Sequence, residues 1–277
     1  MKKFWSSLIF AALVLVLTAC GSSEEEDSSG DGDQSEITVG ASSTPHAEIL
    51  QEAQPLLEEE GITLNVEEYQ DYVLPNRDLD EGEIDANYFQ HIPYLEEQEE
   101  QNGYDFANLG GIHIEPMGIY SKDFKSLDDV KDGTTVLMSN STADHGRILS
   151  LLEEEGLITL DEDVDKVEAT VDDVAENPKN LEFDAGIDAA LLPENYERED
   201  NVLVAINTNY AIEAELNPSE DALILEGTDS PYVNVIAAQS DDEDNEALNT
   251  LVEVLRSDDI QTFIEEEYEG AVVPVDE

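Results

Sequence analysis

Residues 37–66, ITVGASSTPHAEILQEAQPLLEEEGITLNV, predict a strand, a helix and a second strand in succession. Ile37 to Ala41 is a short run that ends in small residues, as a strand does before a loop. The helix is indicated by apolar residues at helical spacing, namely Ile49, Leu50, Ala53, Leu56 and Leu57. Pro55 should kink or break this helix. Gly61 should end it before residues 62–66 alternate as the next strand.

The same succession returns further along the chain. Residues 134–138 (TTVLM) have the composition of a strand, and a helical stripe before Gly156 consists of Ile148, Leu149, Leu151 and Leu152. Residues 233–236 (VNVI) predict another strand. Two helices follow, with apolar residues at Leu248, Leu251, Val252 and Leu255, and at Ile260, Phe263 and Ile264. Strands that alternate with helices predict an α/β protein with largely parallel sheets.

The composition is strongly acidic: 69 Asp and Glu stand against 11 Lys and Arg, for a formal net charge of −58. So few cations cannot neutralise rows of phosphates, which excludes nucleic-acid binding as the main activity. Leu, Ile, Val and Phe still supply 74 of the 277 residues, enough for a folded core. Because salt screens carboxylates from one another, we expect a high-salt environment outside the cell membrane. A calcium-binding interpretation of residues 161–165 is weaker, since they lack the glycine turn of a calcium loop.

The amino terminus predicts export and lipid attachment. Lys2 and Lys3 precede a short apolar run, so residues 1–19 are expected to be a signal peptide. Leu17-Thr18-Ala19-Cys20 resembles the lipobox of bacterial lipoproteins, which implies that Cys20 is diacylated and anchors the protein to the membrane. Residues 20–35 have almost no apolar side chains and are expected to form a flexible acidic tether. The alternative is an ordinary cleaved signal in which the cysteine is incidental.

No catalytic motif is present in the sequence: we find no nucleophile elbow, phosphate-binding loop, zinc-protease motif or dinucleotide-binding motif. We therefore expect no enzymatic activity and no cofactor. The four histidines, His46, His91, His113 and His145, lack the spacing of a metal site, so no metal is predicted.

Residues 85–94, DANYFQHIPY, are rich in aromatic and amide side chains. Phe89, His91 and Tyr94 cannot all share one face of a strand with Tyr88, because successive side chains point to opposite faces. Some of these rings are therefore expected to point out of the end of the strand, where open α/β sheets bind ligands.

Residues 139–147, SNSTADHGR, form a polar segment that leads into the helix at Ile148. Arg147 at the start of a helix would be a natural receptor for a carboxylate, since free N–H groups and a guanidinium both favour an anion. The other interpretation, a surface arginine that balances nearby acids, is equally compatible with the composition.

Seven segments of the chain resemble the NlpA/MetQ family of methionine-binding lipoproteins, which serve bacterial ABC importers. They are VGASSTPHAEIL, DYVLPN, DANYFQHIPYL, GGIHIEPMGIYS, ENPKNLEF, SPYVNVI and EGAVVPV. The resemblance implies a type II periplasmic-binding-protein fold, with two α/β lobes that close on a ligand in the cleft between them. It implies lobe I at residues 36–115 and 231–277 and lobe II at residues 116–230, with an ABC permease and its ATPase as partners.

The resemblance also implies a set of binding residues. Tyr72, Phe89, His91 and Tyr94 would surround the methionine side chain, since a thioether gains from aromatic contacts. Arg147 would bind the ligand carboxylate, and Asn207 and Asn234 would bind the backbone groups of the amino acid.

One segment departs from the family pattern. The loop before Gly-Arg commonly reads like PNDPTN, whereas residues 139–144 here read SNSTAD. Asp144 could pair with Arg147 and weaken its hold on a carboxylate, or could meet a ligand ammonium. Methionine is thus the first expectation, and a methionine-containing dipeptide, another hydrophobic amino acid or, in a different class, a metal remain as alternatives.

Overall fold

The structure is a computed structural model that describes residues 35–275. The predicted signal peptide, the lipid attachment at Cys20 and nearly all of the predicted tether lie outside the described residues. Within residues 35–275, no helix is long and apolar enough to cross a membrane.

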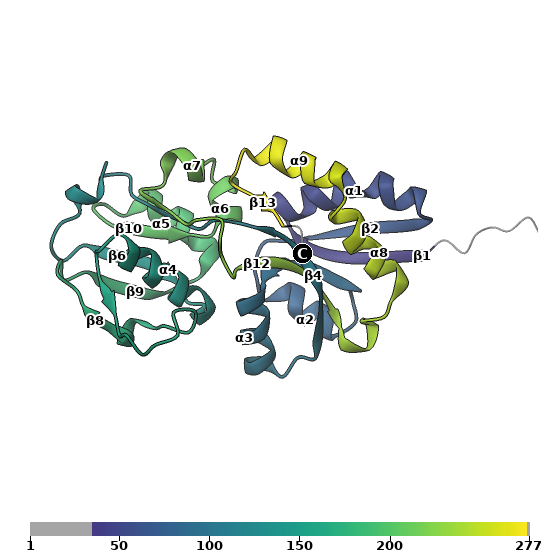
Figure 1. Cartoon of the computed structure of the whole chain (residues 1–277), viewed down its shortest axis with the longest axis horizontal. Coiled ribbons are helices and arrows are strands. Elements are labelled where there is room, and N and C mark those ends of the chain that lie inside the picture. Colours follow the sequence, from purple (N-terminus) through teal and green to yellow (C-terminus); the bar gives the residue numbers. More distant parts are fainter. Residues whose placement is uncertain (1–34, 276–277) are drawn as a thin grey trace, which may run out of the picture. The chain divides into compact units, whose positions relative to one another are not determined.

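A six-stranded sheet is built from both ends of the described chain, in the order β13-β4-β12-β3-β1-β2 (Figure 1). Its strands are β1 (Ser35–Ser42), β2 (Ile62–Tyr69), β3 (Ala86–His91), β4 (Phe106–Ile114), β12 (Val233–Gln239) and β13 (Val273–Pro274). Strand β1 pairs in parallel with β2 and β3, whereas β12 is antiparallel to β3 and β4. Strand β13 is antiparallel to β4.

A five-stranded sheet comes from the middle of the chain, in the order β11-β5-β10-β6-β9. Its strands are β5 (Gly118–Tyr120), β6 (Thr135–Ser139), β9 (Glu182–Ile187), β10 (Leu203–Ile206) and β11 (Ile224–Leu225). Strand β6 pairs in parallel with β9 and β10, and β5 is antiparallel to β10 and β11. A separate two-stranded sheet consists of β7 (Thr159–Leu160) and β8 (Val174–Glu176).

The expectation of largely parallel sheets is wrong, because both large sheets are mixed. Strand β12 enters the first sheet from the second one, through residues 226–232, and not by a helical crossover from a neighbouring strand. A helical crossover returns the chain in the same direction and so imposes a parallel pair, whereas this connection does not.

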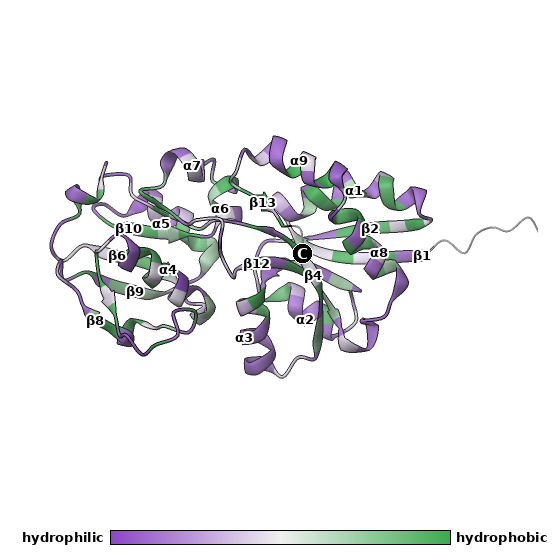
Figure 2. Cartoon of the chain, viewed as in Figure 1, coloured by the Kyte–Doolittle hydropathy of each residue, from purple (hydrophilic) through white to green (hydrophobic). Residues whose placement is uncertain are grey.

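Helices cover both faces of the first sheet (Figure 1). One face carries α1 (Glu48–Glu59), α8 (Glu246–Leu255) and α9 (Asp258–Tyr268), and the other carries α2 (Leu74–Asp80) and α3 (Ile92–Asn102). Strand β12 shows why: Ile236 lies in the core with α1 and α8, whereas Val235 packs in the core with α2 and α3. In Figure 2, α1, α8 and α9 carry both hydrophobic and hydrophilic segments, as helices with one buried face do.

The second sheet has the same two-sided packing. Its helices are α4 (Thr142–Glu154), α5 (Leu192–Arg198), α6 (Thr208–Glu213) and α7 (Pro218–Asp221). Val136 and Met138 of β6 pack with the apolar stripe of α4, and Leu137 between them packs with Leu192 of α5. The helical stripe predicted at residues 148–152 is confirmed.

Pro55 does not break α1, although a break at this proline was one of the two outcomes expected. The helix continues through it to Glu59, and Gly61 follows with φ +79°. Pro55 is exposed, while Ile49 and Leu57 on either side of it are fully buried against the sheet. Their burial outweighs the loss of one backbone hydrogen bond, because each such side chain is worth about 1.5–3 kcal/mol.

Candidate functional site

A cavity lies where residues of the first sheet face α4 and α6 of the second. The structure brings all seven residues named from the sequence to its wall: Tyr72, Phe89, His91, Tyr94, Arg147, Asn207 and Asn234. Five further residues complete the lining, namely Gln90, Glu115, Asp144, Thr208 and Asn209. Eleven of the twelve are buried, and only Tyr72 is half-buried.

Aromatic rings form one end of the cavity. The ring centroid of Tyr72 lies 5.8 Å from that of Phe89 and 5.9 Å from that of Tyr94. The Tyr94 hydroxyl donates to the backbone oxygen of Tyr72 at 3.1 Å, and the Tyr72 hydroxyl donates to Oδ1 of Asn209 at 2.5 Å. Tyr88 packs in the core on the opposite side of β3, as the alternation of the strand predicts.

Three buried amides next to this end of the cavity form a hydrogen-bonded network. Asn76 and Gln90 exchange two hydrogen bonds, at 2.9 and 2.8 Å, and Asn87 joins both of them. Buried polar groups are costly unless they are paired, so this closed network ties α2 to β3 in one arrangement.

Arg147 lies inside α4, as its sixth residue, and does not open the helix as expected. It is 5% exposed, so the interpretation as a surface arginine is wrong. Its ion pair is with Glu226 and not with Asp144: Nε donates to Oε2 of Glu226 at 2.8 Å, and Nη2 contacts the same oxygen. Nη2 also donates to the backbone oxygen of Glu115 at 2.5 Å, and the guanidinium lies 4.6 Å from the ring of Tyr232.

The glycine before Arg147 is required by packing and not by a turn. A Cβ on Gly146 would lie 2.2 Å from the backbone oxygen of Lys166 and 2.4 Å from that of Val167. These distances are far below van der Waals contact, so only glycine lets the 166–167 backbone lie against this face of α4.

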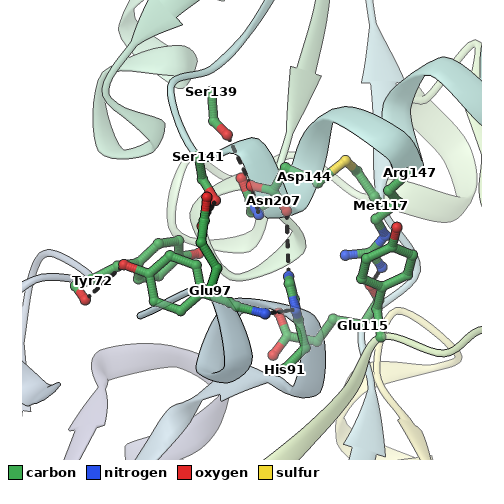
Figure 3. A network of polar contacts seen from close by, with 12 residues as sticks. Tyr72, His91, Glu97, Glu115, Met117, Ser139, Ser141, Asp144, Arg147 and Asn207 are labelled. Carbon is green, nitrogen blue, oxygen red and sulfur yellow. Dashed lines mark hydrogen bonds and ion pairs between the residues drawn. The ribbon is translucent and has the colours of Figure 1, made fainter. Parts of the chain in front are cut away.

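Asp144 is the centre of a second polar network, which Figure 3 shows. Its Oδ2 accepts from Oγ of Ser139 at 2.9 Å and from Nδ2 of Asn207 at 3.2 Å. Its Oδ1 lies 3.3 Å from Nε2 of His91. Nδ1 of His91 accepts from the backbone N–H of Tyr94, so Nε2 carries the proton and donates to Asp144. Burial raises the pKa of Asp144, but the contacts with His91, Arg147 and Asn207 outweigh it, and the net pKa lies below the usual value.

Two buried amide atoms in the cavity wall have no hydrogen-bond partner among the described residues: Oδ1 of Asn207 and Nδ2 of Asn209. The free atom of Asn207 is identified by its other contact, since a carboxylate only accepts, and that of Asn209 follows from the hydrogen bond that Tyr72 donates to it. Asn207 must turn its Nδ2 toward the Asp144 carboxylate, which leaves its oxygen free, and Asn209 uses its oxygen for Tyr72, which leaves its nitrogen free. Because unpaired buried polar atoms are costly, one free acceptor and one free donor indicate a ligand with both polarities.

Glu115 contributes a buried carboxylate that the sequence analysis did not select. Its Oε1 lies 2.8 Å from Nε2 of His113 and 3.1 Å from Nε2 of His46, and its Oε2 accepts from the backbone N–H of Asn209 at 3.0 Å. Burial raises the pKa of Glu115, but the two histidines outweigh it and hold the carboxyl ionised well below its usual range. In the sequence, Glu115 is distinguished only by its position directly after a strand in GGIHIEPMG, one of the segments that resemble the family.

The same three residues, His46, His113 and Glu115, have the side-chain types of a metal site and lie close together. Hydrogen bonds account for their arrangement. Both Nε2 atoms approach one carboxylate oxygen, Nδ1 of His113 contacts the Tyr88 hydroxyl, and Nε2 of His46 lies 3.1 Å from Oδ1 of Asn234. The cluster therefore orients Glu115 and Asn234 toward the cavity.

Comparison with known proteins identifies relatives over the whole described chain. A model of the NlpA lipoprotein family matches residues 37–276. The methionine-binding lipoprotein MetQ of Bacillus subtilis (strain 168) is 47% identical over 279 residues, 100% of each chain. The D-methionine-binding lipoprotein MetQ of Escherichia coli (strain K12) is 35% identical over 274 residues, 98% of each chain. The structure of a nutrient binding protein from Burkholderia cenocepacia bound to methionine is 41% identical, with a TM-score of 0.81 over 86% of this chain and 99% of that one.

Proposed function

The chain belongs to the NlpA lipoprotein family, and on that basis we propose that it captures methionine in the cavity and delivers it to an ABC importer. It acts by binding and performs no chemistry. The observation that carries the proposal is the pair of unpaired buried atoms, Oδ1 of Asn207 and Nδ2 of Asn209, beside a ring of aromatic side chains. A free acceptor, a free donor and an apolar end are what a zwitterion with a thioether side chain requires.

Each part of methionine has a matching part of the wall. The thioether lies against Tyr72, Phe89 and Tyr94, where each sulfur–aromatic contact is worth about 0.3–1.5 kcal/mol. His91 belongs to the same end and holds Asp144. The carboxylate binds Arg147, which Glu226 also holds through an ion pair, and takes a further hydrogen bond from Asn209.

The ammonium binds on the side of the cavity that carries excess negative charge. Asn207 offers its free oxygen there, and Asn234 offers the amide that His46 orients. The carboxylates of Asp144 and Glu115 both line this cavity, and their lowered pKa values keep them charged at neutral pH. Asp144 thus serves ammonium recognition in this proposal, and methionine remains the preferred ligand despite the altered 139–144 segment.

The proposed transport role assigns further parts. Lobe I comprises residues 36–115 and 231–277, lobe II comprises residues 116–230, and they close around the ligand so that the importer distinguishes loaded from empty receptor. The partners are an ABC permease and its ATPase. Cys20 anchors the protein to the outer side of the cell membrane through its lipid.

Isothermal titration of the full-length chain in molar salt tests the ligand assignment. We expect saturable binding of methionine, with much weaker binding of methionine amide, which lacks the carboxylate, and of N-acetylmethionine, which lacks the ammonium. The two methionine enantiomers, the other amino acids and methionine dipeptides complete the series. Tighter binding of a dipeptide or of another hydrophobic amino acid would replace methionine as the ligand.

A variant tests the carboxylate contact. Methionine should raise the melting temperature of the wild type, and Arg147→Ala should remove most of that increase. Arg198→Ala is the matched control, because its side chain is 71% exposed and its one ion pair within residues 35–275 is with Glu194 on the same helix. An unchanged increase in Arg147→Ala would show that the carboxylate is held elsewhere.

A further inference from the structure

Helices α3 and α4 meet beside the cavity although they pack on different sheets. Helix α3 follows directly from β3 of the first sheet, and α4 follows from β6 of the second. Figure 3 shows their point of contact, where the Glu97 side chain reaches Ser141. Any closing movement of the two lobes must make or break the contacts at this point.

Glu97 accepts hydrogen bonds from two hydroxyl groups at the start of α4. Ser141 is the N-cap residue of α4, yet its side chain caps none of the N–H groups of its own helix. Its Oγ instead donates to Oε2 of Glu97 at 3.2 Å, and Oγ1 of Thr142 donates to Oε1 of the same carboxylate. A carboxylate at the positive end of a 13-residue helix also gains from the helix dipole.

The turn of α4 next to this contact carries binding-site residues. Ala143 packs with Phe89 and Tyr94 in the aromatic cluster. Asp144 and Arg147 follow on the same helix and line the cavity. The position of the α4 start relative to α3 therefore decides whether these groups reach the ligand.

The surroundings of Glu97 oppose this contact. Beside it lies a groove lined by Glu96 and Glu100 of α3 and by Asp165 and Glu168 from the second sheet's side. All four are exposed, and none of them forms an ion pair within residues 35–275. Like charges that face each other across a closing groove repel, so these four disfavour the approach that Glu97 favours.

We propose that Glu97 is the latch of the closed receptor, a positioning residue that holds the start of α4 against lobe I once methionine is bound. The proposal rests on the proposed function, because it needs a ligand that closes the lobes. Glu97 does not line the cavity and so touches no ligand atom. It acts through α4. High salt makes closure easier, because it screens the repulsion between the carboxylates of the acidic groove.

The test compares two variants with the same change in charge on the same helix. Glu97→Gln should raise the Kd for L-methionine by about threefold to tenfold, because a partly exposed charged hydrogen bond is lost. The increase should appear in the dissociation rate, measured by stopped flow, with the association rate within about twofold of wild type. Glu100→Gln, which removes only repulsion, should leave Kd unchanged or lower it at low salt, and in about 1 M NaCl this gain should vanish.

A substitution of the residue on α4 that contacts Glu97 separates the loss of this contact from a general loss of stability. Thr142→Ala removes one donor from the other side, and in a double-mutant cycle its effect on the dissociation rate should be smaller when Glu97 is already Gln, because the hydrogen bond then has no charged acceptor to lose. Additive effects, or equal weakening by Glu97→Gln and Glu100→Gln, would overturn the latch. Absence of methionine binding by the wild type would instead refute the proposed function.

Discussion

Asp144→Asn is the sharpest perturbation of the proposed site, because it removes one charge and changes the shape of the side chain very little. Asp144 is 2% exposed and accepts from Ser139, Asn207 and His91. An Asn side chain offers one acceptor oxygen in place of two. Its NH₂ group must therefore face at least one of these three donors.

The expected consequence reaches the ligand through Asn207. If the new NH₂ group lies where Oδ2 was, Asn207 must flip its amide to accept from it. That flip turns Nδ2 of Asn207 toward the cavity, where the free Oδ1 now lies. The ligand ammonium then meets a donor in place of an acceptor and loses a nearby negative charge. The loss of one charged hydrogen bond is worth about 1.5–3 kcal/mol, which corresponds to an increase in Kd of about 10- to 150-fold.

Calorimetry with two ligands separates recognition from general damage. L-Methionine carries the ammonium, and its desamino analogue, 4-(methylthio)butanoic acid, keeps the carboxylate and the thioether. The variant should lose most of its affinity for methionine and little of its weak affinity for the analogue. Asp128→Asn is the matched control, since Asp128 is exposed in the same half of the chain and lines neither the cavity nor the acidic groove, and its Kd should stay within about twofold.

Two results would contradict ammonium recognition by Asp144 and Asn207. Equal loss for both ligands would mean that Asp144 only supports the architecture of the site. Unchanged methionine binding would mean that the ammonium lies away from Asp144 and Asn207.

Three further predictions concern stability. Gly146→Ala should lower the melting temperature by about 4–8 °C in a thermal scan, because the added Cβ would clash with the backbone oxygen of Lys166. Alanine normally favours a helix over glycine by about 1 kcal/mol, so an unchanged or higher melting temperature would show that the packing is not tight. Acidification below pH 6.5 should destabilise the apo protein in urea titrations, because burial lowers the pKa of His113 and only the unfolded chain then binds a proton there. Below pH 4.5 Glu115 adds to this loss of stability, because its pKa is lowered in the folded state and the unfolded chain is protonated first. A free energy of unfolding that stays constant from pH 7 to 4 would contradict both effects. Circular dichroism should show a melting temperature that rises from millimolar to molar NaCl, since salt screens a net charge of −58, and an unchanged value would exclude adaptation to high salt.

Local patterns in the sequence were sufficient to predict several helices and strands. Apolar spacing placed a helix over residues 148–152 and strands at 37–41 and 62–66, because the side-chain period of a helix or strand is visible in a short window. The same rule put Tyr88 on the face opposite Phe89 and His91. Pro55 shows the limit of this reasoning, since its penalty was local and the burial that outweighed it was not.

The resemblance to a family supplied residues that no pattern in this chain singles out. Asn207 and Asn234 lie in ordinary polar positions of the sequence, and the structure places both at the cavity with the aromatic residues. Glu115 and Asn209 were missed because nothing in their neighbours distinguishes a carboxylate or amide that faces a cavity from one that faces solvent. In a chain with 69 acidic residues, composition makes that distinction harder still.

Sequence patterns predicted the α/β class, four of the strands, four of the helices and the aromatic segment at residues 85–94, because these depend on neighbours within a few residues. Only the tertiary structure decided strand direction and the partner of every buried charge. Arg147 pairs with Glu226, 79 residues away, and not with Asp144 three residues before it, because the fold brings Glu226 to the guanidinium and other donors to Asp144. Glu97 reaches the start of α4 across 44 and 45 residues for the same reason. Composition gives the net charge, but only the fold shows which few carboxylates line the cavity and which donors hold them there.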